Sequence, residues 1–567
     1  MVVILRGFLI TLFAAASLQA QNTTISGAVK NASGQPVEGA FVRVSSVDSG
    51  LTFMVVSHEQ GRYVTPNLLP GEYTVEAIGG EYQSNPAGPV ELQNRQQEKM
   101  DLQLTTARIA SPPRQRLTEG EHAARMPAGP AKQIILKKCV SCHTLDRAID
   151  TRTLRIEASR NQWEEVMGTH MYYMEDLPLP MTYEDKALIV DYMTKYFSQE
   201  ADTEGAKREP AARPDRNSHL PTTLAAGAEA KFVMMEFNLQ PSAFPHDISV
   251  ASNGVAWIAE HGENEFGINE HGARGVVKEG AGSLSSIDPE SLKYSHFFPP
   301  KGKYPSRVSG AAVDPQGVVW AVDNSHNARL ISYNPKTGQF RTYPVPAPPR
   351  RKEFDEFGFG DGSANMNSLT FQDGFVWGSG LLSEQVYRLD PVTGGVVTYP
   401  FPKGKPPYGM AFDKNKILWV SLEFADQIVK LDPVTGRQTT YNVLTPHADL
   451  RHVQTDAVGN LWATAQQSGK LIKIDAQSGK LTEYAPPTPN NGILSVDVDR
   501  KHNLIWVAEA EADKMARFDP RTGKFTEFPL PNVRTGLKRI AIDPNNPNRV
   551  WWCATGSNRA GYVEVTE

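Results

Sequence analysis

The 567-residue chain passes through four patterns of hydrophobic and polar positions. An apolar run over Gly7–Ala16 is followed by short alternating runs as far as about Leu104. From Ala131 to about residue 200 the apolar residues recur at steps of three and four, and alternation returns from Lys231 to the end. Alternation is typical of half-buried strands, and the three- and four-residue steps are typical of amphipathic helices. We therefore expect a multidomain, mainly β protein with a small all-α domain between two β domains.

The apolar run near the N-terminus predicts a signal peptide over residues 1–20. It follows the basic residue Arg6 and ends in Leu18-Gln19-Ala20, a small-residue cleavage site before Gln21. The run is short for a membrane span, and an uncleaved anchor is the alternative. We expect an exported protein with no membrane span after cleavage.

Residues 22–104 alternate in short runs, namely Ile25–Val29, Ala40–Val44, Phe53–Ser57, Tyr63–Thr65 and Glu72–Ala77. Turn signals such as Ser33-Gly34-Gln35-Pro36 and Leu69-Pro70-Gly71 separate them. Six or seven strands at this spacing predict a small N-terminal β-sandwich. The glycine, proline and tyrosine pattern resembles the carboxypeptidase regulatory-like domain family, which implies an accessory or adhesion module without catalytic residues.

Two polar stretches, residues 105–130 and 201–230, are predicted linkers, because the first is rich in proline and the second in charge and then in alanine and threonine. Between them, residues 131–200 carry the helical pattern. Three or four helices of this length are enough to surround one haem.

The strongest chemical signal is Cys139-Val140-Ser141-Cys142-His143. A C-x-x-C-H motif is typical of covalent attachment of haem c: Cys139 and Cys142 form thioethers, and His143 is the proximal iron ligand. The alternatives are a C-x-x-C redox pair or half of a zinc site. The third cysteine, Cys553, is far away in the sequence and is expected to be a buried apolar residue.

The helical segment resembles the class I monohaem cytochrome c family. In that family a methionine between the haem motif and the last helix supplies the distal iron ligand. The candidates are Met167, Met171, Met174 and Met181. The resemblance implies Met171, at its distance from Trp163, and His170 is the rival.

Residues 231–567 form a repeat. Its tryptophans recur about 43 residues apart in the later units, a spacing typical of propeller blades; they are Trp257, Trp320, Trp377, Trp419, Trp462, Trp506 and Trp551. Seven such units predict a C-terminal seven-bladed β-propeller. Lys231–Leu239 is similar to Lys524–Leu530. We therefore expect it to complete the last blade and close the ring.

The hairpin geometry of a blade brings the start of its first strand and the end of its second strand to one rim. That rim receives His246, Arg307, Tyr408, Arg451, His452, Lys538 and Arg539 from strand starts, and Glu260, His261, Asp323, His326, Glu423, Gln466 and Glu509 from strand ends. An insertion over Gly267–Ser283 follows in the first unit. Loops of this length usually cover a site or a partner.

The repeat resembles the streptogramin B (virginiamycin B) lyase family, through Gly254-Val255-Ala256-Trp257-Ile258-Ala259-Glu260 and the Tyr-Pro or Phe-Pro strand ends. The resemblance implies a divalent metal such as Mg²⁺ on acidic side chains and a histidine base that opens a cyclic ester. Glu260 and Glu509 are the candidate metal ligands, and His246 and His452 are the candidate catalytic residues. Other units depart from the pattern, with Asp323 or Gln466 near the glutamate position.

The formal net charge of −5 argues against nucleic acid as a partner. Three functions remain open. The first is an exported c-type cytochrome, periplasmic or secreted by a bacterium, that transfers electrons while its propeller binds a substrate or a redox partner protein. The second is a metal-dependent carbon–oxygen lyase in the propeller. The third is an envelope protein that binds glycans or peptides. The sequence leaves open whether the protein is an enzyme, either an oxidoreductase or a lyase.

Overall fold

The structure is a computed structural model. It describes residues 22–108, 123–139, 159–161, 163–164, 167, 181–197, 217–240, 243–262, 282–302, 306–325, 327–346, 366–381, 383–423, 425–533 and 535–566. The predicted signal peptide lies outside these ranges. So do Cys142, His143, His170, Met171, His326 and most of the Gly267–Ser283 insertion.

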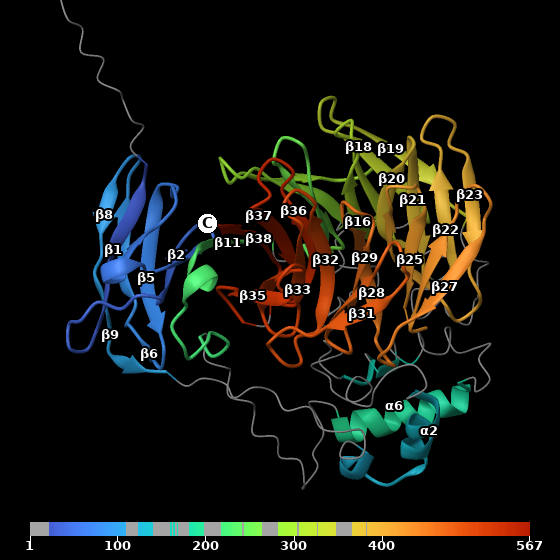
Figure 1. The fold of residues 1–567 in the computed structure, drawn as a ribbon, viewed down its shortest axis with the longest axis horizontal. Helices are drawn as coiled ribbons and strands as arrows, with labels where there is room; N and C mark the ends of the chain where they lie inside the picture. Colours follow the sequence, from blue (N-terminus) through green and yellow to red (C-terminus); the bar gives the residue numbers. More distant parts are fainter. Residues whose placement is uncertain are drawn as a thin grey trace, which may run out of the picture.

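The N-terminal domain is a β-sandwich, as predicted (Figure 1). Its elements are β1 (Thr24–Asn31), β2 (Phe41–Ser46), β3 (Leu51–Val56), η1 (Glu59–Gly61), β4 (Arg62–Val64), β5 (Gly71–Gly79), β6 (Tyr82–Gln83), β7 (Ala87–Leu92), β8 (Gln97–Lys99), β9 (Leu102–Leu104) and β10 (Thr106–Ala107). One sheet has the order β4-β1-β8, with β9 also on β1, and the other runs β10-β6-β5-β2-β3, with β7 on β5. The five runs expected from the sequence correspond to β1 to β5.

The C-terminal domain consists of antiparallel four-stranded sheets in chain order. Blade 1 comprises β12 (Pro245–Val250), β13 (Ala256–Glu260), β14 (Ser283–Ile287) and β15 (Tyr294–Phe297); blade 2, β16 (Val308–Val313), β17 (Val319–Asp323), β18 (Arg329–Asn334) and β19 (Gln339–Pro344); and blade 3, β20 (Met366–Gln372), β21 (Phe375–Gly380), β22 (Gln385–Leu389) and β23 (Val396–Pro400). Blade 4 comprises β24 (Pro407–Phe412), β25 (Leu418–Leu422), β26 (Gln427–Leu431) and β27 (Gln438–Asn442); blade 5, β28 (Leu450–Thr455), β29 (Leu461–Ala465), β30 (Lys470–Ile474) and β31 (Leu481–Tyr484); and blade 6, β32 (Ile493–Asp499), β33 (Leu504–Glu509), β34 (Lys514–Asp519) and β35 (Lys524–Pro529).

Blade 7 is built from both ends of the domain. It comprises β36 (Leu537–Ile542), β37 (Arg549–Ala554), β38 (Arg559–Val565) and β11 (Phe232–Asn238), which pairs antiparallel with β38. The first strands of neighbouring blades contact one another, and β36 contacts β12, so the ring is closed. The expected closure by Lys231–Leu239 is confirmed, because β11 supplies the strand that blade 7 lacks.

The second edge of β11 pairs with the sandwich, which the sequence did not predict. β11 is antiparallel to β3, with Met234 opposite Met54. The β10-β6-β5-β2-β3 sheet of the sandwich therefore continues through β11 into blade 7 as a ten-stranded sheet (Figure 1). Phe41 and Met54 share an apolar core with Trp506 and Trp552. Because the two domains share a sheet and a core, they form one packed unit.

Residues 217–230, in the stretch assigned to a linker, pack at this junction. The buried guanidinium of Arg108 donates to main-chain oxygens of Asn217 (2.9 Å), Leu220 (2.5 Å) and Pro221 (2.9 Å). The fully buried Arg43 contacts the side chain of Asn217 at 2.7 Å. The segment ends in the short helix η3 (Gly227–Ala230).

Two α-helices occur in the described part of the middle segment, and they contact each other: α2 (Pro130–Lys138) and α6 (Tyr183–Phe197). Pro130 stands at the first position of α2, where a missing N–H is harmless. Thr182 and Asp185 cap α6 reciprocally, and Lys138 at the end of α2 pairs with Asp185 at 2.6 Å. Within the described residues no helix is long and apolar enough to cross a membrane.

Candidate functional site

Each first strand of a blade carries an irregularity close to its start. The pairing register shifts between Pro245 and Asp247 in β12, and at the matching place in each of the other six first strands. A bulge leaves a residue unpaired and re-aims its side chain. The residues at the shifts are His246, Gly310-Ala311, Asn367-Ser368, Tyr408-Gly409, Arg451-His452, Leu494 and Lys538. The fold therefore gives the predicted rim residues of several blades one equivalent position.

Buried hydroxyls on the second strands hold these bulges. Ser421 accepts a hydrogen bond from the N–H of Gly409 at 2.8 Å and donates to the main-chain oxygen of Arg451 in the next blade. Thr464 repeats this, accepting from the N–H of His452 (3.1 Å) and donating to the main-chain oxygen of Leu494 (2.7 Å). A Cβ on Gly409 would lie 2.4 Å from the Arg451 oxygen. Only glycine therefore allows this approach.

Blade 3 carries the same device, with Ser379 accepting from the N–H of Ser368 (3.1 Å) and donating to the Tyr408 oxygen (2.6 Å). These hydroxyls were not among the residues predicted from the sequence. The signal was a Ser or Thr two positions after the blade tryptophans Trp377, Trp419 and Trp462.

His246 lies in a short chain of contacts between blades 1 and 7. Its ring stacks on that of His261, with centroids 4.3 Å apart. Its Nδ1 lies 3.2 Å from Asp247, whose other carboxylate oxygen is 3.3 Å from Nε of Arg539. His246 and Asp247 are both buried. The carboxylate is therefore placed to orient the imidazole and to balance the charge of Arg539.

His452 is buried among positive groups. Burial lowers the pKa of its imidazole well below the usual value, and the charges of Arg539, Lys538, His246 and Arg451 lower it further. Its Nδ1 has no hydrogen-bond partner among the described residues. A neutral imidazole has one nitrogen that can accept a proton. Burial and the neighbouring charges thus favour the neutral imidazole of His452.

Tyr408 and Arg451 flank His452 on the side of blade 4. The rings of Tyr408 and His452 meet edge to face with centroids 5.2 Å apart, and the guanidinium carbon of Arg451 is 4.9 Å from the Tyr408 centroid. Arg451 pairs with Glu423 and, at 3.0 Å, with Asp449. We call His246, Asp247, Arg451, His452, Lys538 and Arg539 the axial cluster. The structure brings together the two predicted catalytic histidines in this cluster.

Glu260, a predicted metal ligand, is fully buried inside blade 1. Its Oε1 accepts hydrogen bonds from Ser285 (2.6 Å) and Tyr294 (2.5 Å), and its Oε2 accepts one from Ser283 (2.7 Å). Burial, followed by the charge of Glu260, raises the pKa of the Tyr294 hydroxyl. A carboxylate with these three donors has little capacity left for Mg²⁺, which prefers carboxylates and water in an octahedron.

Glu509 occupies the matching place in blade 6 and differs in its partners. Burial, with the nearby charge of Glu527, raises its pKa well above the usual value. No described residue donates to its oxygens. Lys514 pairs with Glu527 at 2.6 Å. Lys514 thus already places a positive charge beside these two carboxyl groups, where a bound metal would place its own. Among the described residues no group of three or more His, Cys, Asp or Glu side chains could hold a metal ion.

In the helical segment, Cys139 is buried at the end of α2. It shares an apolar cluster with Trp163, Met167 and Met181. The indole nitrogen of Trp163, a fully buried residue, has no hydrogen-bond partner among the described residues. A buried N–H needs an acceptor, and a haem propionate would supply one beside the apolar contacts that a porphyrin requires. These residues fit the haem that the motif implies.

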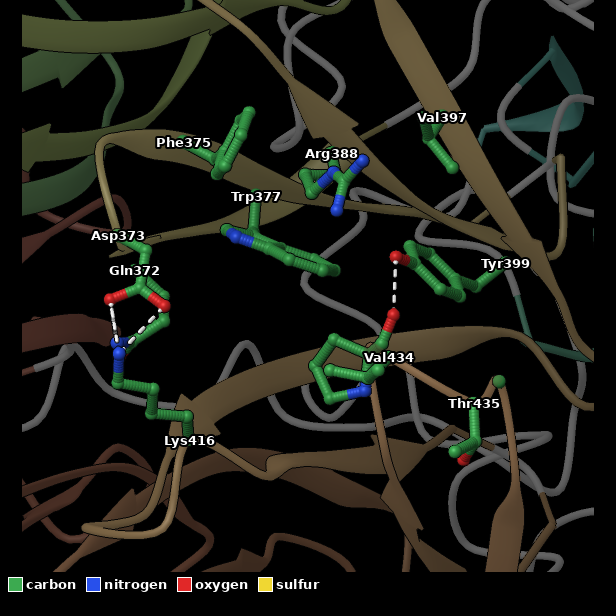
Figure 2. A pocket seen from close by; sticks show the side chains of 12 residues that line it. Gln372, Asp373, Phe375, Trp377, Arg388, Val397, Tyr399, Lys416, Val434 and Thr435 are labelled. Atoms are coloured by element: carbon green, nitrogen blue, oxygen red, sulfur yellow. Dashed lines mark hydrogen bonds and ion pairs between the residues drawn. The ribbon is translucent and has the colours of Figure 1, made fainter.

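A separate cavity of about 590 Å³ opens between blades 3 and 4, and no rim residue predicted from the sequence lines it (Figure 2). The guanidinium carbon of Arg388 lies 4.7 Å from the ring centroid of Phe375 there, and Lys416 pairs with Asp373 at 2.8 Å. Trp377 lines the cavity, and its indole N–H lacks a partner among the described residues. The matching Trp320, Trp419 and Trp462 donate to Asp314, Asp413 and Asp456.

Comparison with known proteins identifies both β domains. A family model described as the virginiamycin B lyase family matches residues 307–567, and one described as the carboxypeptidase regulatory-like domain matches residues 24–105. The chain carries a virginiamycin B lyase-like propeller. Blades 2 to 6 and strands β36 to β38 of blade 7 lie within the first match, whereas blade 1, β11 and the helical segment lie outside both. A comparison with curated proteins gives no match.

Solved structures agree at the level of the fold. A structure titled "Streptogramin B lyase structure" is 22% identical, with a TM-score of 0.50, over 60% of this chain and 100% of that chain. A selenomethionine-substituted virginiamycin B lyase from Staphylococcus aureus is 19% identical, with a TM-score of 0.48, over 59% of this chain and 100% of that chain. The family-model match and the first of these structures support the lyase-like propeller fold.

Proposed function

We propose that this protein is an exported c-type cytochrome that transfers electrons in the periplasm or outside the cell, with its propeller binding a small-molecule substrate or a redox partner protein. The observation that carries the proposal is the C-x-x-C-H motif, whose first cysteine, Cys139, is buried at the end of α2. Cys142 would form the second thioether, and His143 and Met171 would be the axial ligands, with His170 as the alternative to Met171. Bound haem supplies a one-electron carrier.

The packing of the helical segment supports the proposal. α2 and α6 contact each other, and the apolar cluster around Cys139 includes Trp163 and Met167. The N–H of Trp163 is left for an acceptor outside the described residues. The metal-dependent lyase alternative has less support, because neither Glu260 nor Glu509 has surroundings that fit a divalent cation.

The test is expression of the full chain in a bacterial host that matures c-type cytochromes. We expect haem to remain on the denatured polypeptide and a reduced-minus-oxidised spectrum to show the haem bands. Cys139→Ser and Cys142→Ser each remove a thioether, whereas Cys553→Ser is the matched control, because Cys553 is fully buried in blade 7. A wild-type protein without covalent haem would overturn the proposal.

The distal ligand is tested on the same haem-bearing protein. Ligation by Met171 predicts a near-infrared sulfur-to-iron band in the oxidised protein, and Met171→Leu should abolish it. His170→Ala should leave the band in place. A wild-type spectrum without the band would favour His170, and a bis-histidine haem has a lower potential than a methionine–histidine haem.

A further inference from the structure

The bulge positions around the propeller axis differ in character from blade to blade. Blades 1, 5 and 7 place His246, Arg451 with His452, and Lys538 there, and blade 4 contributes Tyr408. Blades 2 and 3 place small or short residues at the matching positions, namely Gly310, Ala311, Asn367 and Ser368. The basic side chains are therefore gathered on one arc of the ring, and the opposite arc is lined by small groups.

Three side-chain nitrogens of this arc have no hydrogen-bond partner among the described residues. Nη1 of Arg539 and Nδ1 of His452 are both buried without a hydrogen-bond partner. The half-buried Lys538 makes no hydrogen bond or ion pair there. His452 is only 4% exposed. An unsatisfied donor costs free energy when it is buried, so such groups normally have a partner in the working protein.

The carboxylates of the axial cluster and its surroundings are already engaged. Asp247 contacts Arg539 and His246, at 3.3 and 3.2 Å. Glu423 and Asp449 both pair with Arg451. None of these pairs compensates the charge of Lys538. An added anion would therefore meet the cation of Lys538, an unused N–H of Arg539 and, in the tautomer with a proton on Nδ1, an unused N–H of His452.

We propose that the axial cluster binds the oxyanion group of a small organic acid, a carboxylate or a phosphate, between Lys538, Arg539 and His452. Arginine and lysine form short, charge-assisted hydrogen bonds with such groups. Because blades 2 and 3 carry small or short residues at these positions, the opposite arc has room for the rest of the bound organic acid. The site thus takes an anion beside the two histidines for which the family resemblance implies a role as a base. The inference rests on the propeller alone and is independent of the haem.

The test is isothermal titration of the full-length, haem-loaded protein with inorganic phosphate and, separately, with succinate, in a low-salt buffer. We expect saturable, one-site binding of at least one probe. Lys538→Met and His452→Asn should each weaken binding about tenfold or more, as expected for loss of a charged or buried hydrogen bond. Lys524→Met is the control, because Lys524 is exposed on the outer strand β35.

Thermal melting shows whether each variant folds. Lys538→Gln is measured as a second substitution, because it removes the charge but keeps a polar side chain. The proposal is overturned if neither probe binds to the folded wild-type protein. It is also overturned if both Lys538 variants bind as the wild type does, or if Mg²⁺ binds and depends on the axial cluster. If the wild-type protein from the host that matures c-type cytochromes carries no covalent haem but still binds the anion, only the proposed electron-transfer function is overturned.

Discussion

The guanidinium of Arg108 donates a hydrogen bond of 2.9 Å to the main-chain oxygen of Asn217, 109 positions later in the chain. The same side chain contacts main-chain oxygens of Leu220 and Pro221. The polypeptide therefore leaves the sandwich at Arg108 and returns beside it at Asn217. Everything between them, including the haem motif, is inserted at one point of a continuous sandwich–propeller unit.

This relationship predicts that the inserted segment can be removed. Replacing residues 109–216 by a flexible linker of about six Gly and Ser residues should leave the melting temperature of the sandwich–propeller unit unchanged, because both ends of the cut lie side by side. Calorimetry of the shortened protein against the full chain checks this. Arg108→Ala in the shortened protein should cost about 2–4 kcal/mol, since buried carbonyl oxygens lose their donor. Aggregation of the shortened protein, or no effect of Arg108→Ala, would contradict the inference.

Removing the sandwich, unlike removing the inserted segment, should make the rest of the protein associate. Without residues 22–108 the edge of β11 that pairs with β3 becomes free, and Phe232 and Met234 lose apolar partners in Phe41 and Met54. Unpaired strand edges beside apolar surface promote association. We expect the remaining chain to form soluble oligomers or to precipitate, as measured by light scattering. A stable monomer would show that β11 does not need its second partner.

The sequence predicts the two β architectures because their signals are local: short alternating runs, regular turns and one tryptophan per blade. Ring closure was also predictable, since Lys231–Leu239 resembles a known blade strand. The pairing of β11 with β3 was not, because a strand's pattern shows which face is buried but not how many edges are paired. The role of Glu260 depends on Ser283, Ser285 and Tyr294, which follow a long insertion. No sequence spacing indicates that these three residues contact Glu260, so its role could not be predicted.

His219 makes the junction sensitive to acid. Its side chain is half-buried, with Nε2 2.7 Å from the main-chain oxygen of Leu530 and Nδ1 enclosed without a hydrogen-bond partner among the described residues, and burial lowers its pKa to about 4. The unfolded chain takes up a proton near pH 6.5, whereas the folded chain takes it up only near pH 4. The free energy of unfolding should therefore decrease as the pH falls through this window, by about 2 kcal/mol from this group at pH 5.

Chemical denaturation at pH 7 and pH 5 measures the effect. In His219→Gln the loss of stability between the two pH values should be smaller by about 2 kcal/mol, because the titrating group is gone. His58→Gln is the matched control, since His58 is an exposed histidine of the sandwich. Equal pH dependence in the wild type and His219→Gln would show that His219 titrates normally.

Glu260 and Glu509 occupy matching places and should respond differently to substitution. Glu260→Ala removes the carboxylate that accepts from the buried hydroxyls of Ser283 and Ser285 and from the half-buried hydroxyl of Tyr294, and should cost about 3 kcal/mol or more. Glu509→Gln introduces a neutral group of similar shape at a place where burial raises the pKa of the carboxyl and so favours its neutral form, and it should change stability by about 0.5 kcal/mol or less. Thermal melting with and without Mg²⁺ checks both. Stabilisation by Mg²⁺ that disappears in either variant would instead assign these residues to a metal site.

The hydroxyl of Ser421 should hold Arg451 and His452 of the axial cluster in position through a main-chain hydrogen bond. It bridges Gly409 in blade 4 to the main-chain oxygen of Arg451 in blade 5. Ser421→Ala removes the donor that fixes this bulge and leaves a buried carbonyl without it. We expect a loss of about 1–3 kcal/mol in stability, together with weaker binding of phosphate or succinate, because Arg451 and His452 are no longer held in place.

Thr455→Val is the control that distinguishes an effect of Ser421 on the position of Arg451 and His452 from a general loss of stability. Thr455 donates to the main-chain oxygen of Phe412 at 2.7 Å, so it also joins blades 4 and 5, but at the other end of β28. The two variants should lose similar stability, and only Ser421→Ala should weaken anion binding. Equal affinities in the two variants would show that the hydroxyl supports the fold alone. A weakened affinity in Ser421→Ala only would make Ser421 a positioning residue, because the two bonds are alike in chemistry and differ in their distance from His452.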